Sequence, residues 1–192
     1  MKKIGRLEVI CGSMFSGKSE MLINQINRSK YAKKSSIAIK PSIDHRYSLD
    51  FIVCHNTLRE KAMAIDIHSN YYDVLINTTE KFDVIAIDEI QFFSERIIDS
   101  IMHLVEKKKH VIVSGLDLNF RGEPFGIMPQ LLALSDTITK LRAVCVTCGE
   151  DANFSQRLID GREAKYSDPT ILVGGSECYE ARCRNCFIID KP

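Results

Sequence analysis

The chain has 192 residues, of which 45% are hydrophobic and 27% are charged, and its formal net charge is +1. This length allows one domain with a substantial core, or one domain with a small appendage, and the composition is typical of soluble globular proteins. No apolar run approaches the roughly 18 to 20 residues that span a bilayer, and no secretory signal is recognisable, so we expect no membrane partner. The near-neutral charge also argues against a nucleic-acid partner.

Segments that predict strands alternate with segments that predict helices along the first three quarters of the chain. Strands are expected at 5–12, 35–41, 62–66, 82–90, 110–116 and 136–145, and helices at 19–34, 71–77, 94–109 and 126–135. Ser94 is the expected N-cap of the third helix. Residues 44–56 fit an arm or a hairpin. This alternation predicts an α/β fold in which helices flank a parallel sheet.

A glycine-rich turn lies between the first predicted strand and the first predicted helix. Gly12, Gly17, Lys18 and Ser19 match the pattern G-x-x-x-x-G-K-[ST], which predicts a P-loop and a P-loop NTPase-like fold. Backbone N–H groups of such a turn close around a polyphosphate, the lysine reaches the β- and γ-phosphates, and the serine ligates Mg²⁺. The expected nucleotide-binding residues are Gly12, Ser13, Met14, Phe15, Ser16, Gly17, Lys18 and Ser19. The alternative is a chance match in an unrelated loop.

Two adjacent acidic residues end the most apolar predicted strand, in the segment 82–90. A P-loop needs an acidic partner for its metal, and Asp88 at the end of a buried strand can hold Mg²⁺. Glu89 is then left to act as general base toward a water or a substrate hydroxyl. The alternative is that both acids only cap the helix that begins near Ser94.

Four of the seven cysteines form two Cys-x-x-Cys pairs, which are 34 residues apart. Cys145, Cys148, Cys183 and Cys186 together predict a tetrahedral zinc site that ties the base of a long loop. Redox pairing is the alternative, although neither pair begins a βαβ unit. The odd cysteine count, without a signal peptide, indicates a reducing, cytoplasmic location.

The character of the chain changes after residue 142, so we expect a P-loop α/β domain at 1–142 and a zinc-binding unit at 143–192. The 34 residues between the cysteine pairs are rich in glycine and charge and show no clear periodicity. Such a segment is either disordered or a functional loop. A second loop, at 116–126, carries Phe120 and Phe125, which fit either ordinary packing or a stacking platform for a flat base.

These motifs in this order resemble the thymidine kinases of the compact, zinc-containing cytosolic type. The shared segments are GSMFSGKS, IKPSIDHRY, DEIQFF, GLDLNFRGEPFG and the two cysteine pairs, and the resemblance covers nearly the whole chain. It implies transfer of the γ-phosphoryl group of ATP to the 5′-hydroxyl of thymidine, in nucleotide salvage for DNA synthesis. It also implies a cytoplasmic homotetramer that contains structural Zn²⁺, uses Mg²⁺ with ATP and is inhibited by the end product dTTP.

The resemblance further implies roles for particular residues of this chain. Glu89 corresponds to the catalytic base and Phe120 to a nucleoside contact. The long loop folds over the base like a lasso, and its matching positions are Thr170, Ile171, Leu172, Val173, Gly174 and Tyr179. The segments that contribute further to nucleotide binding are Asp44, His45 and Arg46, and Asp88, Glu89, Ile90 and Gln91. Asn119 stands where many relatives have aspartate, which bears on hydrogen bonding in its loop.

Two other function classes fit part of the pattern. A nucleic-acid-stimulated ATPase with a zinc-ribbon module is permitted by the P-loop and the cysteine pairs, but the small size and the near-neutral charge argue against it. A nucleotide-switch GTPase is the other, and the sequence has no Asn-Lys-x-Asp guanine-reading motif. The sequence therefore favours a deoxynucleoside kinase.

Overall fold

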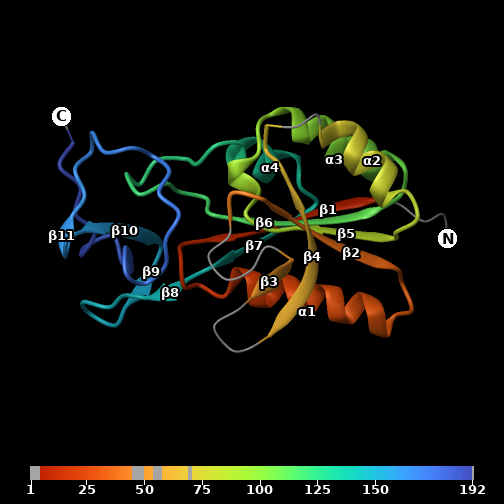
Figure 1. Cartoon of the computed structure of the whole chain (residues 1–192). Coiled ribbons are helices and arrows are strands. Elements are labelled where there is room, and N and C mark those ends of the chain that lie inside the picture. Colours follow the sequence, from red (N-terminus) through yellow and green to blue (C-terminus); the bar gives the residue numbers. More distant parts are fainter. Residues whose placement is uncertain (1–4, 45–49, 54–57, 69–70, 192) are drawn as a thin grey trace.

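Residues 5–44, 50–53, 58–68 and 71–191 are described by the computed structural model of this chain, shown in Figure 1. They form a seven-stranded sheet in the order β3-β4-β2-β5-β6-β1-β7, with a three-stranded and a two-stranded sheet beside it. The elements of the large sheet and its helices are β1 (Arg6–Gly12), α1 (Lys18–Tyr31), β2 (Ser36–Pro41), β3 (Phe51–Val53), β4 (Arg59–Ile65), α2 (Tyr71–Thr79), β5 (Val84–Ile87), η1 (Ile90–Phe92), α3 (Arg96–Glu106), β6 (His110–Gly115), α4 (Met128–Leu134) and β7 (Thr137–Leu141). Among the described residues of this large sheet, β3 and β4 pair antiparallel, and all other neighbouring strands pair parallel. The predicted α/β fold with a mostly parallel sheet is confirmed.

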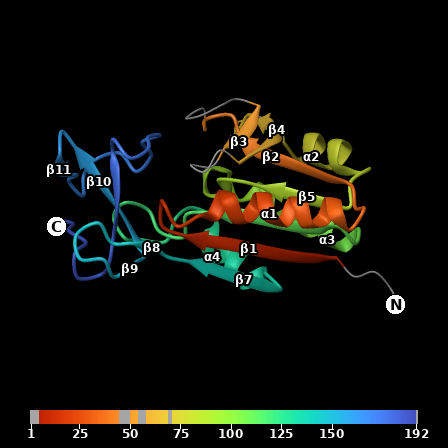
Figure 2. The same ribbon diagram turned by 90° about the horizontal axis from the view of Figure 1, so that it is seen from below.

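Helices cover both faces of the large sheet (Figure 1). Helix α1 lies across one face, as the view in Figure 2 also shows, and its Leu22, Ile23 and Ile26 are buried there. Helices α2, α3 and α4 lie on the other face, where Ile97 and Ile101 of α3 join a larger hydrophobic cluster. The predicted helical periodicities therefore mark the buried sides of α1 and α3.

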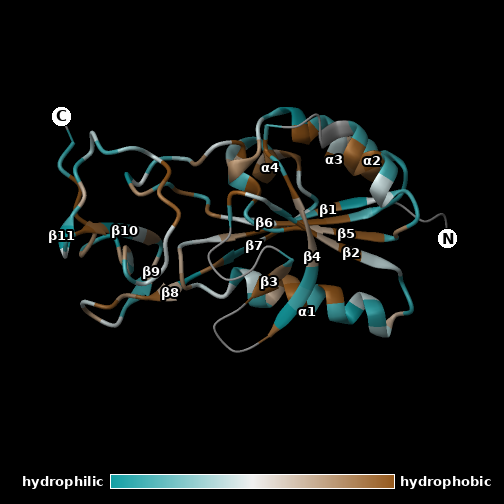
Figure 3. Ribbon diagram, in the orientation of Figure 1, coloured by the Kyte–Doolittle hydropathy of each residue, from teal (hydrophilic) through white to brown (hydrophobic). Residues whose placement is uncertain are grey.

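The central strands explain why the sequence is so apolar between residues 84 and 87. All four residues of β5 are buried, because β5 lies between two parallel neighbours and under helices on both faces. In Figure 3 the central strands are largely coloured as hydrophobic, whereas α1 has hydrophilic and hydrophobic residues side by side. This packing brings the ends of β1 and β5 to one edge of the sheet.

Several predicted boundaries differ from the structure. The strand expected at 82–90 ends at Ile87, because Glu89 has a left-handed φ of 51° and a short 3-10 helix follows. The expected N-cap at Ser94 is wrong: α3 begins at Arg96, and Glu95 occupies the N-cap position without a side-chain cap hydrogen bond. The strand expected at 136–145 is divided into β7 and a separate short strand, β8 (Ala143–Val144).

The last part of the chain contains strands that the sequence analysis did not predict. These are β9 (Asp151–Ala152), β10 (Phe154–Ile159), β11 (Arg162–Glu163) and β12 (Tyr179–Arg182). Strand β10 pairs antiparallel with both β11 and β12. The segment between the cysteine pairs is therefore neither disordered nor only a loop, although residues 164–178 form no helix or strand. A domain boundary between residues 142 and 143 stays a prediction.

The arm or hairpin expected at 44–56 can be compared with the structure only in part. Phe51–Val53 forms β3, which pairs antiparallel with β4 at the sheet edge. Residues 45–49 and 54–57 lie outside the described residues. In the described part of the chain, every helix is too short or too polar to cross a membrane.

Candidate active site

The turn between β1 and α1 has the geometry of a phosphate-binding loop. Gly12 ends β1 with a φ of 144°, and a Cβ there would lie 2.3 Å from the Leu141 carbonyl oxygen, so only glycine fits. Gly17 is the left-handed N-cap of α1, so the first amide groups of the helix face the turn. Lys18 Nζ donates to the Ser13 carbonyl at 2.7 Å, which folds the amine over the loop. The loop can therefore present amide groups and an ammonium group to an anion.

Asp88 lies beside this loop, as the sequence analysis predicted. The Ser19 hydroxyl donates to Asp88 Oδ2 at 2.9 Å, and the Ser114 hydroxyl donates to the other carboxylate oxygen. Burial raises the pKa of Asp88 to about 6, the Glu89 charge adds to the rise, and the two serine hydrogen bonds oppose it. A hydroxyl and a carboxylate in contact are hard oxygen ligands of the kind Mg²⁺ prefers, so the pair fits a magnesium site.

Glu89 has different partners from Asp88 and lines a pocket. Its left-handed backbone, with a φ of 51°, is unusual for a non-glycine residue. Gln91 Nε2 donates to Glu89 Oε2 at 2.6 Å, and Gln91 Oε1 accepts the Leu116 amide at 3.1 Å. The carboxylate is thus held in place at the wall of a pocket, where a nucleophile can meet it.

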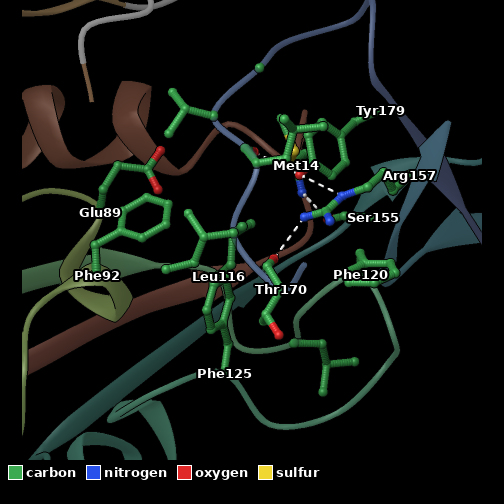
Figure 4. Close-up of a pocket in the computed structure, with 15 residues that line it drawn as sticks. Met14, Glu89, Phe92, Leu116, Phe120, Phe125, Ser155, Arg157, Thr170 and Tyr179 are labelled. Carbon is green, nitrogen blue, oxygen red and sulfur yellow. Dashed lines mark hydrogen bonds between the residues drawn. The ribbon is translucent and has the colours of Figure 1, made fainter. Parts of the chain in front are cut away.

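That pocket lies between the phosphate loop and the long C-terminal loop (Figure 4). Its walls include Met14 from the phosphate loop, Glu89 and Phe92 after β5, and Phe120 and Phe125 from the segment 116–126. Residues 170–174 of the long loop form another part of the wall. The pocket is therefore mostly apolar, with one carboxylate in its lining, as in many small-molecule sites.

The structure brings together every residue that the sequence analysis assigned to the nucleoside. Phe120, Thr170, Ile171, Leu172, Val173, Gly174 and Tyr179 all line this pocket. Sequence reasoning missed Ser155 and Arg157 of β10, which line it too. Strand β10 was not expected because its buried positions include polar residues. Ser155 and Arg157 are two residues apart, and this spacing would place both on one face of a strand.

The predicted nucleotide-binding residues are not all placed alike. Asp44 is buried near Lys40, with 3.5 Å between Oδ2 and Nζ, and its charge acts on Asp88. His45 and Arg46 lie outside the described residues. Ile90 is fully buried in the hydrophobic cluster that also contains Ile97 and Ile101 of α3.

Asn119 suits its loop despite the departure from the usual aspartate. Its Oδ1 accepts the Arg121 amide at 2.8 Å and the Glu123 amide at 3.1 Å. An amide oxygen accepts these bonds as a carboxylate would. The turn between residues 119 and 123 is therefore closed.

Four cysteine side chains converge at the base of the long loop. The Sγ atoms of Cys145, Cys148, Cys183 and Cys186 all lie within 4.8 Å of one another, and Cys148 and Cys183 are 3.6 Å apart. Tetrahedral zinc with Zn–S bonds of about 2.3 Å needs sulfur atoms roughly 3.8 Å apart. The four thiols therefore form a cluster that can bind zinc.

The other described cysteines have structural surroundings. Burial raises the pKa of the Cys11 thiol to about 11, which makes it a poor nucleophile. Cys178 packs against the cluster that contains Phe120 and Tyr179. Cys54 lies outside the described residues.

Comparison with known proteins places these features in one family. The family model described as thymidine kinase matches residues 5–187, which is nearly the whole chain. Among solved structures, a DNA replication initiation factor is similar with a TM-score of 0.42 and 12% identity. That match covers 71% of this chain and 40% of the other chain, and a likeness this weak carries no argument about function.

Proposed function

This chain belongs to the thymidine kinase family, and we propose that it transfers the γ-phosphoryl group of ATP to the 5′-hydroxyl of thymidine, giving dTMP and ADP. The observation that carries the proposal is one pocket lined by Glu89, by Met14 of the phosphate loop and by residues 170–174. A carboxylate between a polyphosphate site and a mostly apolar pocket suits phosphoryl transfer to a nucleoside hydroxyl.

The phosphate end is assigned to the segment Gly12–Ser19. Its amide groups would surround the β- and γ-phosphates, and Lys18 would exchange the Ser13 carbonyl for phosphate oxygens. Ser19 and Asp88 would hold the Mg²⁺ that accompanies ATP, which supplies charge neutralisation when bound. Asp44, His45 and Arg46 are proposed to lie near the triphosphate.

Glu89 is proposed as the general base. Its carboxylate accepts the proton of the 5′-hydroxyl while the 5′-oxygen forms a bond to the γ-phosphorus. The bond between the γ-phosphorus and the β–γ bridging oxygen breaks at the same time, so ADP leaves with that oxygen. Gln91 keeps the carboxylate facing the pocket throughout.

The base is proposed to be recognised by backbone groups of residues 170–174. This stretch offers few polar side chains, yet each of its residues carries an amide and a carbonyl group. Thymine has a carbonyl–imide–carbonyl edge that pairs with such groups. A purine would leave some of them unpaired and would crowd the apolar walls, which disfavours it.

Further properties are proposed from family membership. Zinc at the four cysteines is structural, because four thiolates fill its coordination. The protein is proposed to be a cytoplasmic homotetramer that dTTP inhibits, with dTTP offering a thymine to the pocket and a triphosphate to the loop. Free thiols at all described cysteines suit a reducing compartment.

The proposal is tested by following both products of the wild-type protein. Incubation with ATP, Mg²⁺ and thymidine should yield dTMP and ADP in equal amounts. ADP without dTMP would contradict the kinase assignment. A nucleic-acid-stimulated ATPase, the alternative, would instead release phosphate faster when DNA or RNA is added.

A further inference from the structure

We propose that Arg157 is a positioning residue that holds residues 168–172 in their binding conformation before any nucleoside arrives. The expected effect on thymidine affinity rests on the proposed function. The ordering of residues 168–172 by Arg157 concerns the ligand-free protein and does not. Arg157 lies on β10 and is only 3% exposed.

All three nitrogens of the Arg157 guanidinium group donate to the long loop or to Tyr179. Its terminal nitrogens donate to the carbonyl oxygens of Pro169 and Thr170, the second at 2.7 Å. Its Nε donates to the Tyr179 hydroxyl at 3.0 Å, and that hydroxyl donates to the Leu172 carbonyl at 2.8 Å. One side chain thus fixes, directly or through Tyr179, the carbonyls of three of four consecutive residues.

Aromatic rings and guanidinium groups alternate on both sides of this contact. Arg157 lies 3.9 Å from the Phe120 ring centroid and 5.3 Å from that of Tyr179. Beyond Phe120, Arg121 lies 5.3 Å from its ring and 4.8 Å from the Tyr166 ring. Each contact adds cation–π stabilisation, which is stronger where the cation is buried, as at Arg157.

This alternating set of rings and guanidinium groups also contacts Asp168, the first of the residues 168–172. Arg121 donates to the Asp168 carbonyl at 2.9 Å, so the carbonyls of residues 168, 169, 170 and 172 all accept from the stack. We call Tyr166, Arg121, Phe120, Arg157 and Tyr179 the arginine–aromatic stack. Its members come from three separate parts of the chain, so it ties the segment 116–126 and β10 to the long loop.

Fixing the carbonyls also fixes the amides of the same peptide units. In a planar trans peptide the N–H points opposite to the C=O, so binding the Thr170 and Leu172 carbonyls orients the Ile171 and Val173 amides. Within the described part of the chain, neither amide donates a hydrogen bond. Both are therefore oriented and available for a ligand carbonyl, which lowers the ordering cost of binding.

Strand β10 also places the stack relative to the phosphate loop. Ser155 and Arg157 are two residues apart and share one face of the strand. The Ser155 hydroxyl accepts the Met14 amide at 2.9 Å, and the Ser13 hydroxyl donates to the Ala152 carbonyl at 3.1 Å. Strand β10 therefore connects residues 168–172 to the phosphate loop through hydrogen bonds at both places.

The test uses Arg157→Lys, which keeps the charge but loses the planar fork. Limited digestion of the ligand-free protein with thermolysin, which cleaves before Ile and Leu, reports on the bonds before Ile171 and Leu172. We expect cleavage there to be roughly ten- to a hundredfold faster than in wild type, because charge-assisted hydrogen bonds are lost. Arg162→Lys, at an exposed site on β11, is the matched control and should be cleaved like wild type.

The kinetic readout separates positioning from a general loss of structure. KM for thymidine should rise about ten- to a hundredfold, while KM for ATP changes less than threefold and the zinc content stays unchanged. Tyr179→Phe removes the link to the Leu172 carbonyl and the acceptor of Arg157 Nε, but it leaves the Arg157 bonds to Pro169 and Thr170, so it should show a smaller shift in the same direction. It serves as the second variant if Arg157→Lys does not fold.

Two results would overturn the inference. One is wild-type resistance to thermolysin in both variants. The other is an equal rise of the two KM values. If wild type phosphorylates no thymidine, the proposed function fails, yet the thermolysin comparison still decides whether Arg157 holds the loop.

Discussion

Gln91 Nε2 lies 2.6 Å from Glu89 Oε2 and donates a hydrogen bond to it. The amide oxygen of the same glutamine accepts the Leu116 amide, so the glutamine cannot rotate without losing both bonds. Asp88, one residue earlier, is instead held by Ser19 and Ser114. Two adjacent carboxylates thus have separate partners and face separate places, as separate tasks require.

Replacing Glu89 should therefore remove the base without disturbing the phosphate loop. Glu89→Gln is expected to lower kcat by about 10²- to 10⁴-fold, because a general base contributes about that much. ATP affinity, measured by calorimetry, should stay near the wild-type value. Glu106→Gln, at an exposed position on α3, is the control. Turnover of Glu89→Gln close to wild type would show that another group takes the proton.

The Ser19 hydroxyl is expected to contribute to the magnesium site with Asp88. Ser19→Ala should raise the Mg²⁺ concentration for half-maximal activity by about 10- to 100-fold, since losing a partner in a metal site has that effect. A titration of activity with Mg²⁺ at fixed ATP measures it. Ser135→Ala is a matched control, because Ser135 bonds only to the Leu132 carbonyl near the end of α4. An unchanged Mg²⁺ requirement in Ser19→Ala would remove Ser19 from the site.

The four-cysteine cluster should hold one zinc ion per chain. Metal analysis of the purified protein is expected to find close to one equivalent, and Cys148→Ser should lose it and unfold at lower temperature. Cys178→Ser, outside the cluster, should retain the metal. Fully active protein without zinc would contradict a structural role for the ion.

The large sheet and the position of the turn between β1 and α1 are the parts that sequence patterns predict well. The apolar run at 84–87 reads as a buried strand because both of its faces are covered, and the G-x-x-x-x-G-K-S turn has a strict spacing. Glu89 and Asp88 follow from their place at the end of that strand. These elements depend on local residue types, so the sequence reveals them.

Strand β10 could not be predicted, for a physical reason. Gln156 and Arg157 are almost fully buried, which hides the usual alternation of polar and apolar positions. Gln156 exchanges hydrogen bonds with the backbone of Ile188, and Arg157 bonds the long loop, both far along the chain. Their burial is made favourable by tertiary partners that no local window contains.

Thymidine should protect the two oriented amides of the long loop. Hydrogen exchange at Ile171 and Val173 is expected to slow when thymidine is added, because each amide would gain an acceptor. The amide of Arg162 on β11 should be unaffected. Equal exchange at Ile171 and Val173 with and without saturating thymidine would rule out backbone recognition by this segment.

Phosphorylation of a pyrimidine deoxynucleoside by this chain can be measured directly. γ-Labelled ATP is incubated with wild-type protein, Mg²⁺ and, in separate reactions, thymidine, deoxyuridine, deoxycytidine, deoxyadenosine and deoxyguanosine. We predict label transfer to thymidine and none above background to either purine nucleoside, because a purine would leave the proposed backbone partners at residues 170–174 unpaired. Equal labelling of deoxyadenosine, or no labelled nucleotide with any nucleoside, would show that this chain is not a pyrimidine deoxynucleoside kinase.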